Sequence, residues 1–173
     1  MKYRRVLLAV LLPLVLIACV VGARHWVLEL ERNPPADSGR PGSWTTVTSE
    51  YVVEFSRVRP PASASEVRWA YLRGFQDDLA FLSFRLPPGE AQGFLAGLGM
   101  ATEPDTGHAF GTYSLEGFRQ AGAPDPLTAG PLRHGSFIAE PLPGHSKRLA
   151  ATVWLAAEGD GGTRVWVDAG DSP

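Results

Sequence analysis

The stretch that decides the fold is Leu79-Ala80-Phe81-Leu82-Ser83-Phe84-Arg85-Leu86. Successive side chains of a β-strand point to opposite faces of a sheet. Positions 80, 82, 84 and 86 therefore place four apolar side chains on one face, and positions 79 and 81 place two on the other. Because a strand that is apolar on both faces is typical of the middle of a covered sheet, residues 79–86 are predicted to form a central strand.

The segments beside this strand have recognisable patterns of their own. Residues 67–73 are rich in aromatic and branched side chains and predict a strand, joined to the first by a turn at 74–78. Pro87-Pro88 ends the central strand. Residues 90–98 predict a short helix that ends before Gly99 and buries three apolar side chains, namely Phe94, Leu95 and Leu98.

The remaining segments are patterned less clearly. Apolar side chains recur at helical steps over residues 47–58, where Thr48 or Ser49 would be the N-cap. Residues 149–156 and 164–168 predict a closing hairpin through the turn at 158–162. Residues 100–146 show little periodicity beyond a short helix around 115–120. Long irregular segments in a compact domain are often functional, so we expect a binding surface there.

These elements predict an α+β fold. The expected domain is a mostly antiparallel four-stranded sheet, packed by one or two helices on one face. It would follow an N-terminal transmembrane helix. The predicted organisation is a membrane anchor or signal segment at 1–32, a Pro/Gly-rich tether at 33–45 and an extracytoplasmic α+β domain at 46–173.

The uncharged run 6–23 follows Lys2, Arg4 and Arg5, and three interpretations fit it. It is long enough to remain as a single-pass anchor. Residues 16–19 also resemble a bacterial lipobox, which would make Cys19 a lipidation site, although valines follow it where small or polar residues are usual. A signal peptidase cut after Ala23 is the third interpretation.

All three interpretations give the same location. Basic residues before a span stay on the cytoplasmic side, so residues 33–173 are expected outside the cytoplasmic membrane. The expected partners are the membrane, through residues 6–23, and an unidentified envelope protein or ligand. Acidic residues outnumber basic ones in the external part, which argues against a nucleic-acid partner.

No arrangement of residues in the sequence predicts catalysis, a metal or a cofactor. His25, His108, His134 and His145 lack the spacing of a zinc site, and no external cysteine can assist them. Ser136 stands close to His134, yet neighbours in sequence rarely form a catalytic triad. We therefore expect exposed loop histidines and no catalytic residue.

The acidic residues of the turns have a structural interpretation. Asp77 and Asp78 are expected to cap a hairpin turn through Asx hydrogen bonds, with an ionic contact to Arg68, Arg73 or Arg85 as the alternative. Asp160 stands among glycines and is expected to serve a turn in the same way.

Tryptophans offer the clearest candidate surface. Trp69, Trp154 and Trp166 fall on predicted strands. If two of them share the face that helices leave open, they form an exposed aromatic platform for binding; the alternative is core and edge packing. We expect Trp44 to dock the tether onto the domain.

Residues 51–99 resemble an uncharacterised family of small membrane-anchored or lipoprotein-like exported proteins of actinobacteria. The shared pattern is a helix, a turn such as Pro61-Ala62-Ser63-Ala64, a strand, Gly-Phe-Gln-Asp at 74–77, a second strand and a short helix containing Phe94-Leu95. The resemblance covers less than a third of the chain. It implies export and membrane attachment, and it brings no activity, cofactor or catalytic residue.

The functional expectation is a non-catalytic binding module of the cell envelope, held at the membrane by its N-terminal segment. This expectation is based on the predicted anchor and on the lack of a catalytic pattern in the sequence. One alternative is a lipoprotein that carries a small apolar or amphiphilic ligand between the sheet and its helices. A cell-envelope hydrolase is a further alternative, and it would need a pocket holding a perturbed titratable group such as His134 or Asp78.

Overall fold

The computed structural model describes residues 42–74, 77–107, 110–141 and 147–172. Gly39–Pro173 forms one compact unit. The predicted span at 6–23 and the candidate lipidation site Cys19 lie outside the described residues. In the part that is described, no helix combines the length and apolar character that crossing a bilayer requires.

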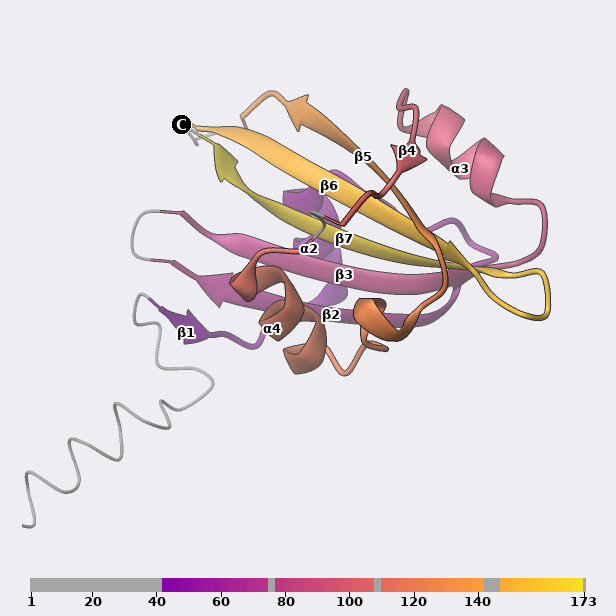
Figure 1. Ribbon diagram of the computed structural model, residues 1–173. Coiled ribbons are helices and arrows are strands. Elements are labelled where there is room, and N and C mark those ends of the chain that lie inside the picture. Colours follow the sequence, from indigo (N-terminus) through magenta and orange to yellow (C-terminus); the bar gives the residue numbers. More distant parts are fainter. Residues whose placement is uncertain (1–41, 75–76, 108–109, 142–146, 173) are drawn as a thin grey trace, which may run out of the picture. The chain divides into compact units, whose positions relative to one another are not determined.

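Within the described residues, seven strands form one antiparallel sheet (Figure 1). In chain order they are β1 (Ser43–Trp44), β2 (Ser65–Arg73), β3 (Leu79–Leu86), β4 (Glu103–Pro104), β5 (Leu132–Ala139), β6 (Arg148–Ala157) and β7 (Thr163–Ser172). Their order across the sheet is β1-β2-β3-β7-β6-β5-β4. The prediction of a four-stranded sheet was therefore wrong, because β1, β4 and β5 also belong to it.

The central strand was predicted correctly. β3 pairs with β2 on one side and with β7 on the other. Its bounds are those expected from the alternating pattern, and both Phe81 and Leu82 are fully buried. Leu82 points to the first face of the sheet, defined as the face that also carries Phe84, and Phe81 points to the second face.

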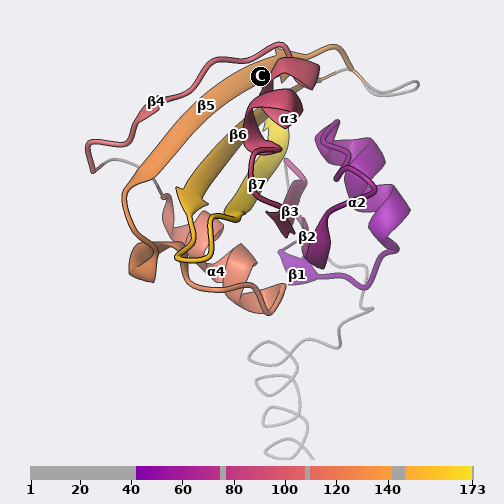
Figure 2. The ribbon, with the colours of Figure 1, turned by 90° about the vertical axis from the view of Figure 1, so that its right-hand side faces the viewer.

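Helices cover both faces, which corrects the predicted fold class (Figure 2). α2 (Ser49–Ser56) and α3 (Ala91–Gly97) pack on the first face, and α4 (Thr112–Gln120) packs on the second. The short helix η1 (Pro126–Thr128) follows α4. The described fold is therefore mostly β, with three α-helices divided between the faces, and not an α+β layer with helices on one side only.

The sequence pattern predicted both α2 and α4, with a shorter α4 than the structure has. The Thr48 side chain caps α2 by accepting a hydrogen bond from the backbone N–H of Tyr51 at 3.3 Å. α2 ends at Arg57, which has a left-handed φ of 59°. α4 begins earlier than the predicted 115–120, and its buried Phe118 meets Phe81 edge-on at 5.8 Å. This contact fixes α4 against the second face.

Part of the predicted tether belongs to the sheet. In β1, Ser43 pairs with Arg73 and Trp44 pairs with Leu72. The Trp44 ring lies 5.7 Å from that of Phe81, centroid to centroid. The expectation that Trp44 docks on the domain is confirmed, and ordered strand structure already exists within the range 33–45.

Candidate functional site

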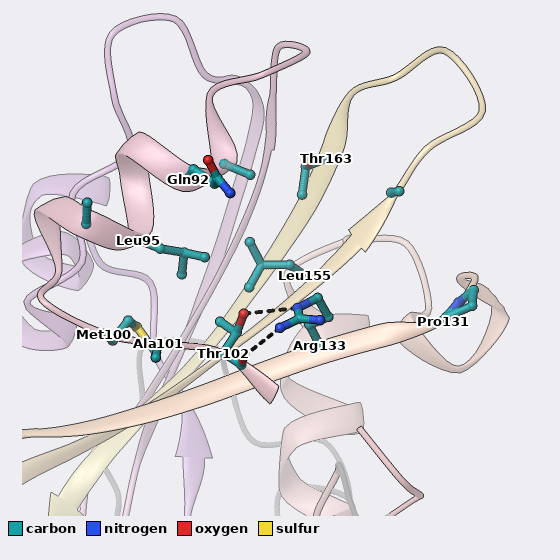
Figure 3. Close-up of a pocket in the computed structure, with 12 residues that line it drawn as sticks. Gln92, Leu95, Met100, Ala101, Thr102, Pro131, Arg133, Leu155 and Thr163 are labelled. Atoms are coloured by element: carbon teal, nitrogen blue, oxygen red, sulfur yellow. Dashed lines mark hydrogen bonds between the residues drawn. The ribbon is translucent and has the colours of Figure 1, made fainter. Parts of the chain in front are cut away.

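An open groove lies on the first face, between α3 and the strands β5, β6 and β7 (Figure 3). Its volume is about 880 Å³. One side is formed by α3 and residues 100–102, and the other side and floor by the strands. Small-molecule sites in proteins commonly enclose about 300–1,000 Å³, so the groove has the size of a ligand site.

The wall formed by α3 is held by aromatic packing. Phe94 meets Phe84 of the sheet edge-on, with ring centroids 5.4 Å apart. The chain leaves the helix through Gly99, whose φ of 64° suits glycine. The N–H of Met100 then donates to the carbonyl of Leu95 at 3.2 Å, which closes the helix end. Residues 100–104 consequently run from α3 back towards β5.

A glycine in β5 allows that segment to come close. A Cβ on Gly135 would lie 2.5 Å from the carbonyl oxygen of Ala101 and 2.6 Å from Cε of Met100. Beyond this contact, β4 pairs with β5, with Glu103 opposite His134 and Pro104 opposite Arg133. The absence of a side chain at position 135 therefore lets Met100 and Ala101, which line one side of the groove, lie directly against β5.

The lining of the groove is mainly apolar. Leu155 of β6 and Leu95 of α3 point into it from opposite sides, with Met100 beside them (Figure 3). Gln92 and Thr163 add polar groups. Arg133 is the one charged side chain of this described lining. Such a surface suits an apolar body with a single polar group.

The Arg133 guanidinium is fixed by one residue. Its Nε donates to Thr102 Oγ1 at 3.1 Å and its Nη2 donates to the Thr102 carbonyl at 2.6 Å. Figure 3 draws both bonds. Because the side chain is exposed, its other N–H groups remain open to solvent or to a ligand. The groove thus offers positioned binding groups but no carboxylate, imidazole or thiol that could move a proton.

The expected aromatic platform is not formed. Trp154 and Trp166 do share a face, and they are cross-strand neighbours. That face is the second one, where both are almost fully buried, at 4% and 1% exposure. Phe110 lies over Trp154 with ring centroids 4.6 Å apart. These tryptophans therefore take the core-packing alternative.

Trp69 is separate from the other two tryptophans. It is partly exposed, at 39%, and lies on β2. Its Nε1 donates to the carbonyl of Val47 at 3.0 Å, so it packs against the segment that leads into α2. The three candidate residues thus do not make one surface.

The His and Ser candidates are not arranged for catalysis. Ser136 Oγ lies 3.0 Å from Thr152 Oγ1 on the neighbouring strand, and either hydroxyl can donate. His134 lies beside Glu103, with Nε2 3.6 Å from Oε1. The other three histidines, His25, His108 and His145, fall outside the described residues. Among the residues that the structure describes, no group of three metal-ligating side chains is placed to hold an ion.

Asp78 serves the hairpin turn, as predicted. Its Oδ1 accepts from the Gly74 backbone N–H at 3.0 Å and its Oδ2 accepts from the Tyr71 hydroxyl at 2.5 Å. Burial, supported by this bond to Asp78, raises the pKa of Tyr71 far above its usual value. Asp77 instead pairs with Lys147, at 2.5 Å, a partner the sequence did not suggest.

Asp160 also serves its turn, and it belongs to a charge network as well. Its Oδ1 accepts from the Gly162 backbone N–H at 3.0 Å, which lowers the pKa of the carboxyl. Its other oxygen pairs with Arg85 of β3. Arg85 also pairs with Glu158 at 2.6 Å, and Glu158 pairs with buried Arg164 of β7 at 3.0 Å. These contacts join the β6–β7 turn to β3.

One partly buried acid was missed at the sequence level. Asp168 of β7 points to the second face and accepts a hydrogen bond from the Ser114 hydroxyl of α4. Burial raises the pKa of its carboxyl. The available signal was the alternation of β7: position 168 shares a face with Trp166, so the acid had to point inward.

Comparisons of the chain with protein-family models, with curated proteins and with solved structures found no match. A functional proposal therefore rests on the geometry and chemistry of the groove.

Proposed function

We propose that this protein is a membrane-anchored, extracytoplasmic binding protein without catalytic activity, and that it holds a ligand in the groove between α3 and strands β5–β7. The observation that carries the proposal is the groove itself, about 880 Å³ in volume with a mainly apolar lining. Its position agrees with the expectation that residues 100–146 supply a binding surface, because Met100, Thr102 and Arg133 all line it.

The chemistry of the lining supports ligand binding over an enzymatic role. An enzyme that transfers protons or groups needs a nucleophile or a titratable side chain at its pocket. The described lining offers apolar side chains, a glutamine, two threonines and one arginine. The burial of Trp154 and Trp166 removes the aromatic platform that favoured a protein partner. A small ligand in the groove therefore fits the structure better than a protein docked on the sheet.

The location outside the cell is the second part of the proposal. It is supported by Lys2, Arg4 and Arg5, which precede the uncharged run 6–23. The intact mass of the protein extracted from its own membranes tests this part. The full chain mass supports a retained anchor, and a mass that begins at Cys19 with a diacylglyceryl group supports a lipoprotein. A soluble protein recovered only from the cytoplasm contradicts it.

Native mass spectrometry tests the groove. The wild-type chain is compared with Ala96→Trp, which fills the groove from the exposed side of α3. Gln120→Trp, on an exposed position of α4, is the matched control. We expect a co-purifying mass on the wild type and on the control, and at least a tenfold lower occupancy on Ala96→Trp. Equal occupancy of all three proteins would place the ligand elsewhere.

A further inference from the structure

The edge of the Arg133 guanidinium that does not contact Thr102 indicates the chemical class of the ligand. A guanidinium has five N–H groups in one plane. The Nε–H and one Nη2 N–H of Arg133 donate to Thr102, and these two N–H groups point from the same edge of the plane. The neighbouring edge, formed by Nη1 and Nη2, keeps two parallel N–H groups. Parallel N–H groups of this kind match the two oxygens of a carboxylate.

The electrostatic setting of Arg133 differs from that of the arginines in the charge network at the β6–β7 turn. Arg85 and Arg164 each face two carboxylates. Among the described residues Arg133 has no acidic partner, and its side-chain hydrogen bonds there go to Thr102 alone. The described lining of the groove contains no acid either. The groove therefore presents one uncompensated positive charge at the side of an apolar floor.

We propose that the groove binds a single-chain carboxylic acid, that is, a fatty acid. Its carboxylate lies on the Nη1–Nη2 edge of Arg133, and its acyl chain covers Leu95, Met100 and Leu155. This inference rests on the proposed binding function and names the ligand class. Charge complementarity selects the acid, and the apolar floor selects the chain.

An acyl chain fits this lining better than a peptide that ends in a carboxylate. Each peptide unit brings an N–H and a C=O that lose water on binding and then need hydrogen-bond partners. Away from Arg133 and Thr102 the lining is mainly apolar, and its largest side chains, Leu95, Met100 and Leu155, supply none. Gln92 and Thr163 are too few to pair the backbone groups of a peptide. An acyl chain has no such groups, so burying it costs no hydrogen bond.

Photo-crosslinking with a C16 fatty acid that carries a diazirine in its tail tests the proposal. The full chain is placed in phosphatidylcholine nanodiscs, labelled, and the labelled residues are located by peptide mapping. Competition uses palmitic acid and the C16 alcohol of equal chain length. The test variant is Arg133→Gln. Arg68→Gln is the matched control, because Arg68 is also exposed and has no acidic hydrogen-bond or salt-bridge partner among the described residues.

We expect saturable labelling at the groove residues Leu95, Met100 or Leu155. Palmitic acid should compete at least about tenfold better than the alcohol, because it alone forms charge-assisted hydrogen bonds with Arg133. Arg133→Gln should remove that difference, and Arg68→Gln should keep it.

Three contrary outcomes are distinguishable. Groove labelling with equal competition by acid and alcohol, unchanged in Arg133→Gln, would overturn the carboxylate inference and leave the binding function in place. Labelling outside the groove, together with equal native-mass occupancy in Ala96→Trp, would overturn both. A peptide mass as the co-purifying ligand would also reject the fatty acid.

Discussion

At the scale of single residues, Asp168 shows how a fold holds an acid in an unfavourable place. Its carboxylate points under α4, where it accepts a hydrogen bond from the Ser114 hydroxyl. Burial raises its pKa above the value in the unfolded chain. A raised pKa in an acid means that the folded protein prefers the protonated form. The charged form therefore destabilises the fold.

The pH dependence follows from this sign. Below the unfolded pKa of Asp, about 3.9, both states are protonated and the residue makes no difference. As pH rises through that value towards the higher folded pKa, the unfolded chain releases its proton first, so stability falls. Asp168→Asn keeps an oxygen that accepts from Ser114 and removes the titration.

We therefore expect Asp168→Asn to become more stable than the wild type as pH rises from about 4 to 7. The measurement is urea unfolding at several pH values. Glu54→Gln, an exposed position on α2, is the control for losing one carboxylate. A difference between Asp168→Asn and wild type that does not change with pH would contradict the assignment of this penalty to Asp168.

Residue roles were predicted from sequence only where the environment is local. Asp78 and Asp160 were correctly assigned to turns, because each accepts a hydrogen bond from a backbone N–H that is near in the chain, Gly74 and Gly162 respectively. The role of Arg133 depends on Thr102, which lies 31 residues away. The burial of Trp154 depends on α4 covering the second face. Neither the contact of Arg133 with Thr102 nor the burial of Trp154 under α4 can be predicted from a local sequence pattern, because both depend on residues far apart in the chain.

At the scale of elements, two glycines in helices have opposite surroundings. A Cβ on Gly117 of α4 would lie 2.3 Å from the Phe81 ring. A Cβ on Gly93 of α3 would meet nothing within 4 Å. The first glycine lets α4 lie close to the sheet. The second only lowers the intrinsic stability of its helix.

The two alanine variants should therefore change stability in opposite directions. Gly117→Ala is expected to destabilise by about 1–3 kcal/mol, because the added methyl overpacks against Phe81. Gly93→Ala is expected to stabilise by about 0.5–1 kcal/mol through helix propensity. Chemical denaturation of both variants gives the comparison. A stabilised Gly117→Ala protein would mean that α4 does not rest on Phe81.

The prediction of elements was correct for strands with strong alternation and wrong for weak ones. β3 and the β6–β7 hairpin carry large apolar residues at alternate positions, so their period is visible. β5 alternates Leu132, His134 and Ser136 with Arg133, Gly135 and Phe137, and it lies near the sheet edge, where burial is incomplete. β1 and β4 contain two residues each, too few to show a period.

At the scale of the whole domain, two hydrophobic clusters share one sheet. The first contains Leu82 and lies under α2 and α3; the second contains Phe81 and lies under α4. Both residues are fully buried, with 0% exposure, and neither lines the groove. They are adjacent in β3, so loss of either cluster removes support from the same central strand.

We expect the two clusters to unfold together. Phe81→Ala should lower the free energy of unfolding by about 3–5 kcal/mol and Leu82→Ala by about 2–5 kcal/mol. Both variants are made in a background in which Trp26 and Trp69 are replaced by phenylalanine, because Trp69 lies on the first face, opposite Leu82. Tryptophan fluorescence then follows the second face through Trp44, Trp154 and Trp166, and far-ultraviolet circular dichroism follows the sheet. In both variants the two signals should change at the same urea concentration. Leu127→Ala, at a site that is 63% exposed, should shift stability by no more than about 0.5 kcal/mol.

The decisive case is Leu82→Ala, because its cavity opens on the face that Trp154 and Trp166 do not touch. If the fluorescence transition keeps its wild-type midpoint while circular dichroism shifts, the two faces are separate units and the sheet does not couple them. If both shift together, any ligand that stabilises the groove on the first face also stabilises α4 on the second. Ligand binding would then raise the midpoint of the tryptophan signal, although the described lining of the groove contains no tryptophan.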